Sequence, residues 1–425
     1  MTADRRDHFD IAVIGLGYIG LPTAAFFAST GLQVFGYDIN GDRVATIARG
    51  EVPFVEPGFD KLLKDVVESQ SLTVGTSLQP ADVYIISVPT PLSPNKSVDP
   101  SYVFDATKSI APRLRGGELV ILESTSPPGL SEQVAEVLVS ERSDLTLTPG
   151  QAKSIYVAHA PERVLPGKIM EEMTTNARIV GGINPESATR AKALYKRFCK
   201  SDVLVTDART AEMAKLTENA FRDVNIAFAN ELSIICDDLD IDVWELISLA
   251  NRHPRVNILQ PGPGVGGHCI AVDPWFIVDS SPDHARLIKT SRLVNDSKSA
   301  YVLSKINDAL TEVDHKSEHP RIGILGITFK PDIDDLRESP ALNITRQIAL
   351  KHPQVHVHVV EPNLTQLPRS LAELPNINLR DLAPTLENSD ILVILVDHYQ
   401  FRLKAKEISQ SPCTIDTRGL IANYN

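Results

Sequence analysis

Residues 10–20 read DIAVIGLGYIG, and this stretch decides the first part of the fold. A short β-branched run, Asp10 to Ile14, leads directly into the pattern G-x-G-x-x-G. Glycines at this spacing permit a tight turn after a strand and let a pyrophosphate approach the N-terminus of the next helix. The stretch therefore predicts a dinucleotide-binding turn. The residues expected to contact the cofactor there are Gly15, Gly17, Tyr18, Ile19 and Gly20.

The residues that follow complete this unit. A helix is predicted over Ala24 to Ser29 and a second strand over Gln33 to Tyr37, ending at Asp38, 18 residues beyond Gly20. A carboxylate at this place binds a ribose 2′-hydroxyl and repels a 2′-phosphate, which favours NAD over NADP. Arg43 is also expected near the cofactor, although an arginine soon after the acid can meet a phosphate.

Further α/β units are predicted from three apolar runs. Strands are expected over Asp82 to Val88, Leu119 to Leu122 and Tyr156 to Ala158, with the third as the last strand of this domain. Ligands in open α/β sheets bind beyond the carboxyl ends of strands. Thr90 and Thr125, which follow the first two runs, are therefore candidates for cofactor contact; the alternative is that they are ordinary turn hydroxyls.

Glu162 lies in the segment APERVLPG, residues 160–167, just after the third run. At the end of a strand this carboxylate is a candidate general base. An isolated glutamate is more often a surface charge.

Residues 261–275 read PGPGVGGHCIAVDPW and form a second distinctive segment. Its glycines and prolines predict a stiff loop whose backbone allows close approach, so that a bulky ligand could lie against it. Cys269 follows the last glycine, with His268 before it and Asp273 four residues after it, on the same face if the segment turns helical. An imidazole and an acid near a thiol suit a thiolate nucleophile. The alternatives are a buried, inert cysteine and a zinc site; metal-ligand spacings are missing, so no metal is expected.

A long helix is predicted from Thr210 to about Asp238. One apolar stripe at 3 and 4 spacing comprises Met213, Leu216, Ala220, Val224 and Ala227. Lys215, Asn219 and Arg222 share another face, which could simply be solvated. However, Asn219, Asn225 and Asn230 are poor helix formers, and this suggests a function. A helix of this length suits a spine that joins two lobes or pairs two subunits.

A second helix, Val243 to Asn251, precedes a locally basic segment. This segment contains Arg252, His253, Arg255 and Asn257. The planar guanidinium of arginine suits a diphosphate. A solvated loop is an equal alternative.

The last part of the chain repeats the α/β alternation without a G-x-G-x-x-G motif. A polar linker, His315 to Pro320, precedes strands over Arg321 to Ile327, Val355 to Val360 and Ile391 to Val396, with a helix ending near Lys351. We expect a second doubly wound lobe that binds a different nucleotide-like ligand. Lys330 and Arg337 follow its first strand and are either ligand contacts or ordinary loop charges.

Composition sets the remaining bounds. The chain has 425 residues and a net charge of -12, which argues against a general nucleic-acid or membrane-surface binder. Four scattered cysteines fit a reducing cytoplasm. Three domains are expected: an NAD-binding domain over 1–205, a helical, dimerising domain with the cysteine loop over 206–314, and a nucleotide-binding domain over 315–425. The fold class is thus α/β, with two Rossmann-like lobes joined by a helical part.

The chain closely resembles the UDP-glucose/UDP-mannose dehydrogenase family over its whole length. The motifs that carry the resemblance are Gly15 to Gly20, Glu123 to Ser126, Pro161 to Gly167, Glu212 to Glu231, Asn251 to Phe276 and Phe329 to Ser339. UDP-glucose members carry Ser in place of His268 and an acid in place of Pro166. At both positions the chain resembles the branch of the family that acts on UDP-N-acetylhexosamines.

The resemblance implies a reaction. The C6 hydroxymethyl group of UDP-N-acetyl-D-mannosamine would be oxidised by NAD to the carboxylate through a cysteine thioester. The gluco epimer, UDP-glucose and a single oxidation of the hydroxyacid-dehydrogenase type remain alternatives. A homodimer built on the long helix is also implied.

The resemblance also implies site residues. Cys269 would be the nucleophile, Lys215 and Asn219 would stabilise an oxyanion, Asp273 with Thr125 would orient water, and Glu162 would be the base. Arg337 would reach the cofactor. The implied substrate contacts are Glu162, Arg163, Val164, Lys215, Asn219, Arg222, His253, Arg255, Asn257, Gly266, Phe329 and Lys330.

Overall fold

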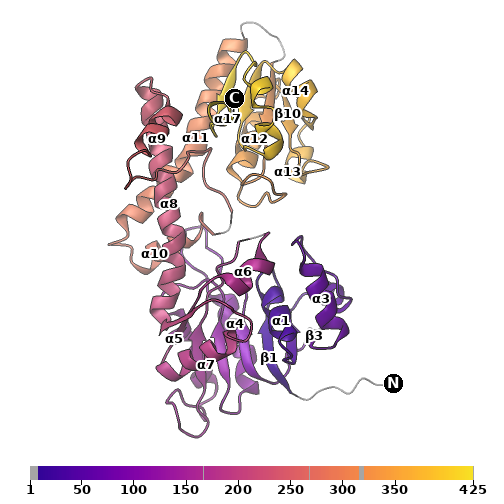
Figure 1. The fold of residues 1–425 in the computed structure, drawn as a ribbon, viewed down its shortest axis with the longest axis vertical. Helices are drawn as coiled ribbons and strands as arrows, with labels where there is room; N and C mark the ends of the chain where they lie inside the picture. Colours follow the sequence, from indigo (N-terminus) through magenta and orange to yellow (C-terminus); the bar gives the residue numbers. More distant parts are fainter. Residues whose placement is uncertain (1–7, 166, 268, 315–319, 425) are drawn as a thin grey trace. The chain divides into compact units, whose positions relative to one another are not determined.

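A computed structural model describes residues 8–165, 167–267, 269–314 and 320–424 of the chain (Figure 1). They form two compact units. The first comprises Met1–Thr217 with Trp275–Ser280, and the second comprises Glu218–Pro274 with Ser281–Asn425. None of the helices among the described residues combines the length and the apolar character needed to cross a membrane.

The first unit contains an eight-stranded sheet in the order β3-β2-β1-β4-β5-β6-β7-β8. All neighbouring strands are parallel except β6 and β7. The strands are β1 (Phe9–Ile14), β2 (Val34–Tyr37), β3 (Leu72–Gly75), β4 (Ala81–Ile86), β5 (Leu119–Leu122), β6 (Tyr156–His159), β7 (Arg178–Gly182) and β8 (Val203–Asp207). The helices are α1 (Gly20–Ser29), α2 (Gly41–Ala48), α3 (Phe59–Glu68), α4 (Ser101–Ile110), η1 (Ala111–Arg113), α5 (Leu130–Glu141), α6 (Ile169–Thr175) and α7 (Pro185–Tyr195).

Both faces of this sheet are covered, as a doubly wound fold requires. Along β1, Ile11 and Val13 enter one buried apolar cluster, whereas Ala12 and Ile14 enter another. The alternation follows from the two-residue side-chain period of a strand. Strand order reverses between β1 and β4, so the glycine turn after β1 lies where such sheets bind ligands.

The prediction that Tyr156 to Ala158 is the last strand of this sheet is wrong, because β7 and β8 follow it. β7 ends in two glycines, Gly181 and Gly182, which weaken the sequence signal for a strand. They are required by close packing: a Cβ on Gly181 would lie 2.3 Å from the carbonyl oxygen of Asp207. The short strand β3 also went unpredicted.

The second unit contains a five-stranded parallel sheet in the order β11-β10-β9-β12-β13. Its strands are β9 (Arg321–Leu325), β10 (His356–Val360), β11 (Ile377–Leu379), β12 (Ile391–Ile394) and β13 (Thr414–Asp416). The helices that follow β9 are α12 (Pro340–Lys351), α13 (Arg369–Ala372), α14 (Leu382–Asn388), α15 (Tyr399–Arg402), α16 (Ala405–Ile408) and α17 (Leu420–Tyr424). Strand order reverses between β9 and β12, which confirms the predicted second Rossmann-like lobe; the predicted linker falls mostly outside the described residues.

The helices that precede this sheet are α8 (Ala208–Asp238), α9 (Val243–Ala250), α10 (Asp273–Ser280) and α11 (Arg286–Asp314). α8 confirms the predicted long helix, whereas α11 was not predicted. Polar residues occupy buried positions of α11, among them Arg292 and Asn295, and these hide its amphipathic period.

The predicted apolar stripe of α8 is only partly correct. Leu216, Ala220 and Ala227 are buried, but Met213 is exposed. Asp223 is fully buried because it pairs with Arg292 of α11 and accepts a hydrogen bond from Asn295 Nδ2 at 2.8 Å. Buried polar side chains therefore join α8 to α11.

Candidate active site

The glycine turn after β1 has the geometry of a dinucleotide cradle. Gly15 has φ +93°, and a Cβ there would lie 2.4 Å from the carbonyl oxygen of Ser87. A Cβ on Gly20 would lie 1.9 Å from the carbonyl oxygen of Gly15, whereas a Cβ on Gly17 would meet nothing within 4 Å. Gly15 and Gly20 are thus required by the turn itself. Gly17 faces open space, where a pyrophosphate can approach the N-terminus of α1.

Asp38 closes this cradle at the end of β2. Its carboxylate accepts hydrogen bonds from the N–H groups of Leu16 and Asn40, both at 2.9 Å, and from Arg43 Nη1 at 3.0 Å. A carboxylate has about four acceptor positions, so one remains for a ribose hydroxyl. Arg43, expected near the cofactor, is held by Asp38. These residues fit NAD, which was the predicted cofactor.

The two predicted threonines lie in adjacent loops after β4 and β5. Thr90 Oγ1 donates a hydrogen bond to the carbonyl oxygen of Thr125 at 2.7 Å, and Ser124 Oγ donates one to the carbonyl oxygen of Val88 at 2.7 Å. The hydroxyl proton of Thr90 is therefore used to join the loops. Both threonines are half-buried.

Tyr18 of the glycine turn is tied to the segment that follows β6. Its hydroxyl donates a hydrogen bond to Glu56 Oε2 at 2.5 Å. The same carboxylate accepts hydrogen bonds from the N–H groups of Gly167 and Ile169 at 2.8 and 2.9 Å. Buried Glu56 thus fixes the end of the segment that carries Glu162. Glu56 was not predicted, because its partners lie far from it in the chain.

Glu162 lies in a buried ion pair rather than on the surface. Its Oε2 atom is 2.6 Å from Arg178 Nη2, and its Oε1 atom accepts hydrogen bonds from the N–H groups of Arg163 and Val164 at 2.7 and 3.2 Å. Arg163 Nη1 donates a hydrogen bond to the carbonyl oxygen of Ala177 at 2.9 Å, so the guanidinium group of Arg163 binds the main chain. The carboxylate of Glu162 therefore has a defined orientation.

A second carboxyl group, Glu123, shares Arg178 with Glu162. Glu123 Oε1 is 3.8 Å from Arg178 Nη1, and the hydroxyls of Thr23 and Tyr195 donate hydrogen bonds to it at 3.0–3.2 Å. Burial and the nearby Glu162 raise the pKa of Glu123 to about 8, despite the opposing effect of Arg178. One buried cation thus faces two carboxyls. Glu123 was not singled out, although a glutamate directly after the buried strand Leu119 to Leu122 was a usable signal.

The glycine loop of the second unit is shaped by protein contacts. A Cβ on Gly266 would lie 2.5 Å from the carbonyl oxygen of Glu338, and one on Gly264 would lie 2.9 Å from Ser299 Oγ. Gly267 has φ +82°, and a Cβ there would lie 3.0 Å from the ring of Phe329. The close approach predicted for this loop is therefore made by the protein itself, and a ligand is not needed to explain these glycines.

Two asparagines of α8 hold this loop at its two ends. Asn230 Oδ1 accepts a hydrogen bond from the N–H of Gly262 at 2.9 Å, and Asn219 Nδ2 donates one to Asp273 Oδ2 at 2.6 Å. The two asparagines are eleven residues apart, about three helical turns, so they share one face. Of the three asparagines singled out in this helix, Asn219 and Asn230 thus contact the loop, whereas Asn225 Nδ2 donates to the carbonyl oxygen of Phe221 in the same helix. Lys215, one turn before Asn219, is half-buried.

Cys269, at the end of this loop, is exposed and forms no disulfide within the described residues. The N–H of Asp273 donates a hydrogen bond to the carbonyl oxygen of Cys269 at 2.8 Å, so the predicted helical turn forms. The Asp273 side chain is buried against Asn219, whereas Cys269 is exposed. His268 and Pro166 lie outside the described residues. Within the described residues, no group of side chains could hold a metal ion.

Lys330 lies near Cys269. Burial lowers the pKa of Lys330, as does the positive charge of Arg222, whereas Asp335 and Cys269 act in the opposite direction. The structure therefore brings together Arg222, Cys269 and Lys330, with Phe329 packed against Gly267.

The remaining predicted residues lie elsewhere on the second unit. Arg337 pairs with the carboxylate of Asp335 at 2.6 Å and is exposed. The basic segment beyond α9 is also exposed; its members are Arg252, His253, Arg255 and Asn257.

Fold and site together define an NAD-dependent dehydrogenase with a second Rossmann-like unit. Models of the UDP-glucose/GDP-mannose dehydrogenase family match the chain in three parts: the NAD-binding domain at residues 9–199, the central domain at 209–297 and the UDP-binding domain at 323–423. The chain belongs to this family. The predicted resemblance is confirmed, with GDP-mannose as the second sugar nucleotide in the family's name.

Individual relatives cover nearly the whole chain. A UDP-N-acetyl-D-mannosamine dehydrogenase of Yersinia pestis is 54% identical over 96% of this chain and 98% of its own length. An NDP-N-acetyl-D-galactosaminuronic acid dehydrogenase of Ralstonia nicotianae is 52% identical over 97% of this chain and 96% of its own length. The solved UDP-D-ManNAc dehydrogenase from Pyrococcus horikoshii superposes with a TM-score of 0.83 at 38% identity, covering 97% of this chain and 96% of that one.

The substitution Glu123→Gln tests the buried carboxyl. Because its folded pKa exceeds the unfolded one, Glu123 contributes stability below about pH 4.5 that is lost as the pH rises to about 8. Glutamine cannot ionise, so the melting temperature of the variant relative to wild type should rise between pH 5 and 8.5. Each kcal/mol corresponds to about 2–4 °C. Scanning calorimetry measures this difference in melting temperature, with Glu136→Gln, at an exposed residue of α5, as the control. A difference that stays constant across this pH range contradicts the assignment.

The substitution Asn230→Ala tests the hold of α8 on the glycine loop. It leaves the N–H of Gly262 and Asn295 Oδ1 without their partner, and such a loss costs about 1–3 kcal/mol. Denaturant unfolding should show this decrease in the free energy of unfolding. Asn225→Ala is the matched control, because the hydrogen bond that Asn225 Nδ2 donates goes to the carbonyl oxygen of Phe221 in its own helix. Equal effects of the two variants would be inconsistent with the proposed hold.

Proposed function

We propose that this protein oxidises the C6 hydroxymethyl group of UDP-N-acetyl-D-mannosamine to the carboxylate, giving UDP-N-acetyl-D-mannosaminuronate. The observation that carries the proposal is the exposed thiol of Cys269, near the cation of Lys330, on a loop fixed by Asn219 and Asn230. A dehydrogenase that performs one oxidation needs no thiol at this place. The relatives named for UDP-N-acetyl-D-mannosamine support the choice of sugar.

The proposed reaction has two oxidations. The C6 alcohol loses a proton and a hydride to become an aldehyde, and the Cys269 thiolate then adds to the carbonyl carbon. Lys215 and Asn219 stabilise the oxyanion, a role that suits a cation and an amide donor. Loss of a second hydride gives a thioester. NAD, when bound by the glycine turn and Asp38, accepts the hydride in each oxidation.

Hydrolysis completes the proposed cycle. Asp273 and Thr125 orient a water molecule, and Glu162 takes its proton as the oxygen attacks the thioester carbonyl. The C–S bond breaks and the thiolate of Cys269 is restored. Overall, the carbon loses four electrons as two hydrides and gains one oxygen atom from water. The ion pair with Arg178 supports this role of Glu162, because it keeps the carboxylate oriented.

The remaining residues are proposed to bind ligands. Lys330 and Arg222 supply positive charge for the diphosphate, with Phe329 and Gly266 beside them. Arg337 is proposed to reach the cofactor. Further proposed substrate contacts are Arg163, Val164, His253, Arg255 and Asn257.

A second substrate is favoured by one specific observation. The Ralstonia relative named for an N-acetyl-D-galactosaminuronic acid is 52% identical to this chain, close to the 54% of the Yersinia relative. The galacto sugar is therefore the main competitor, ahead of the gluco epimer and UDP-glucose. All of them would use the same thiol chemistry.

Counting NADH formed per sugar tests the proposal for wild type and Cys269→Ser. Wild type should form two NADH per UDP-N-acetyl-D-mannosamine, and the variant should lose complete turnover by at least a hundredfold, because serine is a poor nucleophile without activation. Cys413→Ser is the control for loss of another cysteine. One NADH per sugar, or an indifferent variant, would overturn the thioester route; turnover with the galacto sugar alone would change only the substrate.

We also propose that α8 pairs two copies of the chain. Its surface carries Phe221, Phe228 and Ile235, each seven residues after the last, with exposed fractions of 68%, 52% and 46%, and Leu239, 63% exposed, directly follows the helix. Apolar side chains gathered along one helix face mark a protein interface.

The double substitution Phe221→Glu/Phe228→Glu should convert a dimer to a monomer, because it buries charge in the proposed interface. Sedimentation equilibrium measures the mass. Leu350→Glu, at an exposed apolar residue of α12, is the control and should leave the mass unchanged. A monomeric wild type, or a double variant that remains dimeric, would exclude pairing through α8.

A further inference from the structure

The loop after β9 carries two of the proposed substrate residues, Phe329 and Lys330. Thr328 Oγ1 donates a hydrogen bond to the carbonyl oxygen of Lys330 at 3.0 Å, and the N–H of Phe329 donates one to the carbonyl oxygen of Asp335 at 3.1 Å. Asp332, two residues beyond Lys330, has φ +61°. A non-glycine residue in this left-handed region is strained and needs contacts that hold it there.

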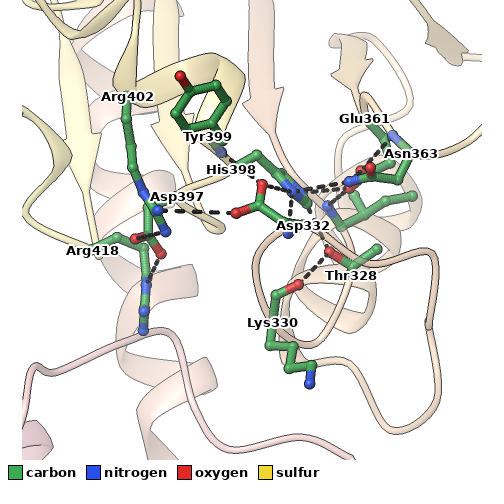
Figure 2. A network of polar contacts seen from close by, with 11 residues as sticks. Thr328, Lys330, Asp332, Glu361, Asn363, Asp397, His398, Tyr399, Arg402 and Arg418 are labelled. Carbon is green, nitrogen blue, oxygen red and sulfur yellow. Dashed lines mark hydrogen bonds and ion pairs between the residues drawn. The ribbon is translucent and has the colours of Figure 1, made fainter. Parts of the chain in front are cut away.

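His398 supplies such a contact from the end of β12. Its Nδ1 atom accepts a hydrogen bond from the N–H of Asp332 at 2.9 Å and lies 3.1 Å from Asn363 Nδ2. Its Nε2 atom lies 3.1 Å from Glu361 Oε2 and 3.3 Å from Thr328 Oγ1. Figure 2 shows the ring of His398 among these partners, at the carboxyl ends of the strands of the second sheet. The side chain is 1% exposed.

The partners define the protonation of the ring. A backbone N–H can only donate, so Nδ1 is the acceptor, and the ring proton is assigned to Nε2, which donates it to Glu361. Glu361 is itself held by the N–H groups of Ile327 and Asn363, at 2.8 and 3.2 Å. Burial would raise the pKa of Glu361, but the hydrogen bond from His398 together with these N–H donors lowers it overall. The tautomer of His398 is therefore fixed from a rigid strand end.

The next residue strengthens the same contact. The N–H of Tyr399 donates a hydrogen bond to Asp332 Oδ1 at 2.7 Å, so Asp332 is held through both its backbone and its carboxylate. Asp397, on the other side of His398, pairs with Arg402 at 3.0 Å and with Arg418 at 2.8 Å. The turn after β12 thus holds the loop after β9 at a strained residue.

We infer that His398 is a positioning residue of the nucleotide-sugar site: by accepting the N–H of Asp332 it sets the conformation of the loop that presents Lys330 and Phe329. The inference rests on the proposed function for the roles of those two residues.

A matched pair of substitutions separates the two contacts of the ring. In His398→Asn, the amide oxygen can occupy the place of Nδ1 and accept the N–H of Asp332, but the side chain is too short for Glu361. In His398→Gln, the amide nitrogen can reach Glu361, but an acceptor for Asp332 is lost. The Gln variant should raise KM for the sugar nucleotide at least tenfold, with KM for NAD unchanged and kcat within about threefold, and the Asn variant should restore much of the loss.

Two further variants keep the test independent of folding. His358→Asn is the control, because His358 is also buried in this sheet and its Nδ1 atom makes no hydrogen bond among the described residues. Asp332→Gly leaves the buried ring in place while it removes the strain and the carboxylate contact, and should raise KM for the sugar nucleotide several-fold. Equal KM values for the Asn and Gln variants, or parallel losses of NAD and sugar-nucleotide affinity, would overturn the inference.

Calorimetric titration with UDP separates this inference from the proposed function. If wild type turns over no nucleotide-sugar, the proposed function fails, and the kinetic comparison falls with it. UDP should still bind the wild type. It should bind the Gln variant more weakly and the Asn variant with nearly wild-type affinity. Equal UDP affinities in all three proteins would exclude a positioning role of His398 even where turnover is intact.

Discussion

The position of the glycine loop depends on hydrogen bonds that the loop cannot make for itself. A segment rich in glycine and proline forms no helix or sheet ladder, and its buried N–H groups need partners from elsewhere. Asn230 provides one for Gly262, and Asn219 binds Asp273 at the other end. The thiol of Cys269 lies between these two points. A helix that carries asparagines at some cost in helix propensity therefore gives a loop without regular secondary structure a defined place.

The buried face of α8 that holds the loop is stabilised in turn by α11. Asn295 Nδ2 donates to Asp223, while its Oδ1 accepts from Asn230 Nδ2 at 2.9 Å. Burial raises the pKa of Asp223 to about 6, with Arg292 and Asn295 acting in the opposite direction. A polar network of this kind is costly when incomplete, so it favours one register of the two helices. That register places Asn219 and Asn230 opposite the ends of the loop.

Local signals in the sequence were sufficient to predict the first sheet around β1, the turn with its three glycines, Asp38 and the long helix α8. Each depends on residues close together in the chain. β7, β11 and α11 were not predictable in this way, because close packing demands glycines in β7 and buried polar pairs interrupt the apolar period of α11. Glu56, Glu123, Arg178 and His398 act through partners 16 to more than 100 residues away, which no local pattern contains.

The two sheets use the same topological position for different purposes. In the first, the turn after β1 leaves an open space beside Gly17, and Asp38 keeps an acceptor position free, so the strand ends are prepared for a ligand. In the second, the ends of β9, β10 and β12 are filled by Thr328, Glu361 and His398, which satisfy one another. Buried polar groups that are fully paired have little capacity left for a ligand. If Lys330 and Phe329 bind the sugar nucleotide as proposed, the second sheet contributes through the loop that its strand ends hold, rather than through the strand ends themselves.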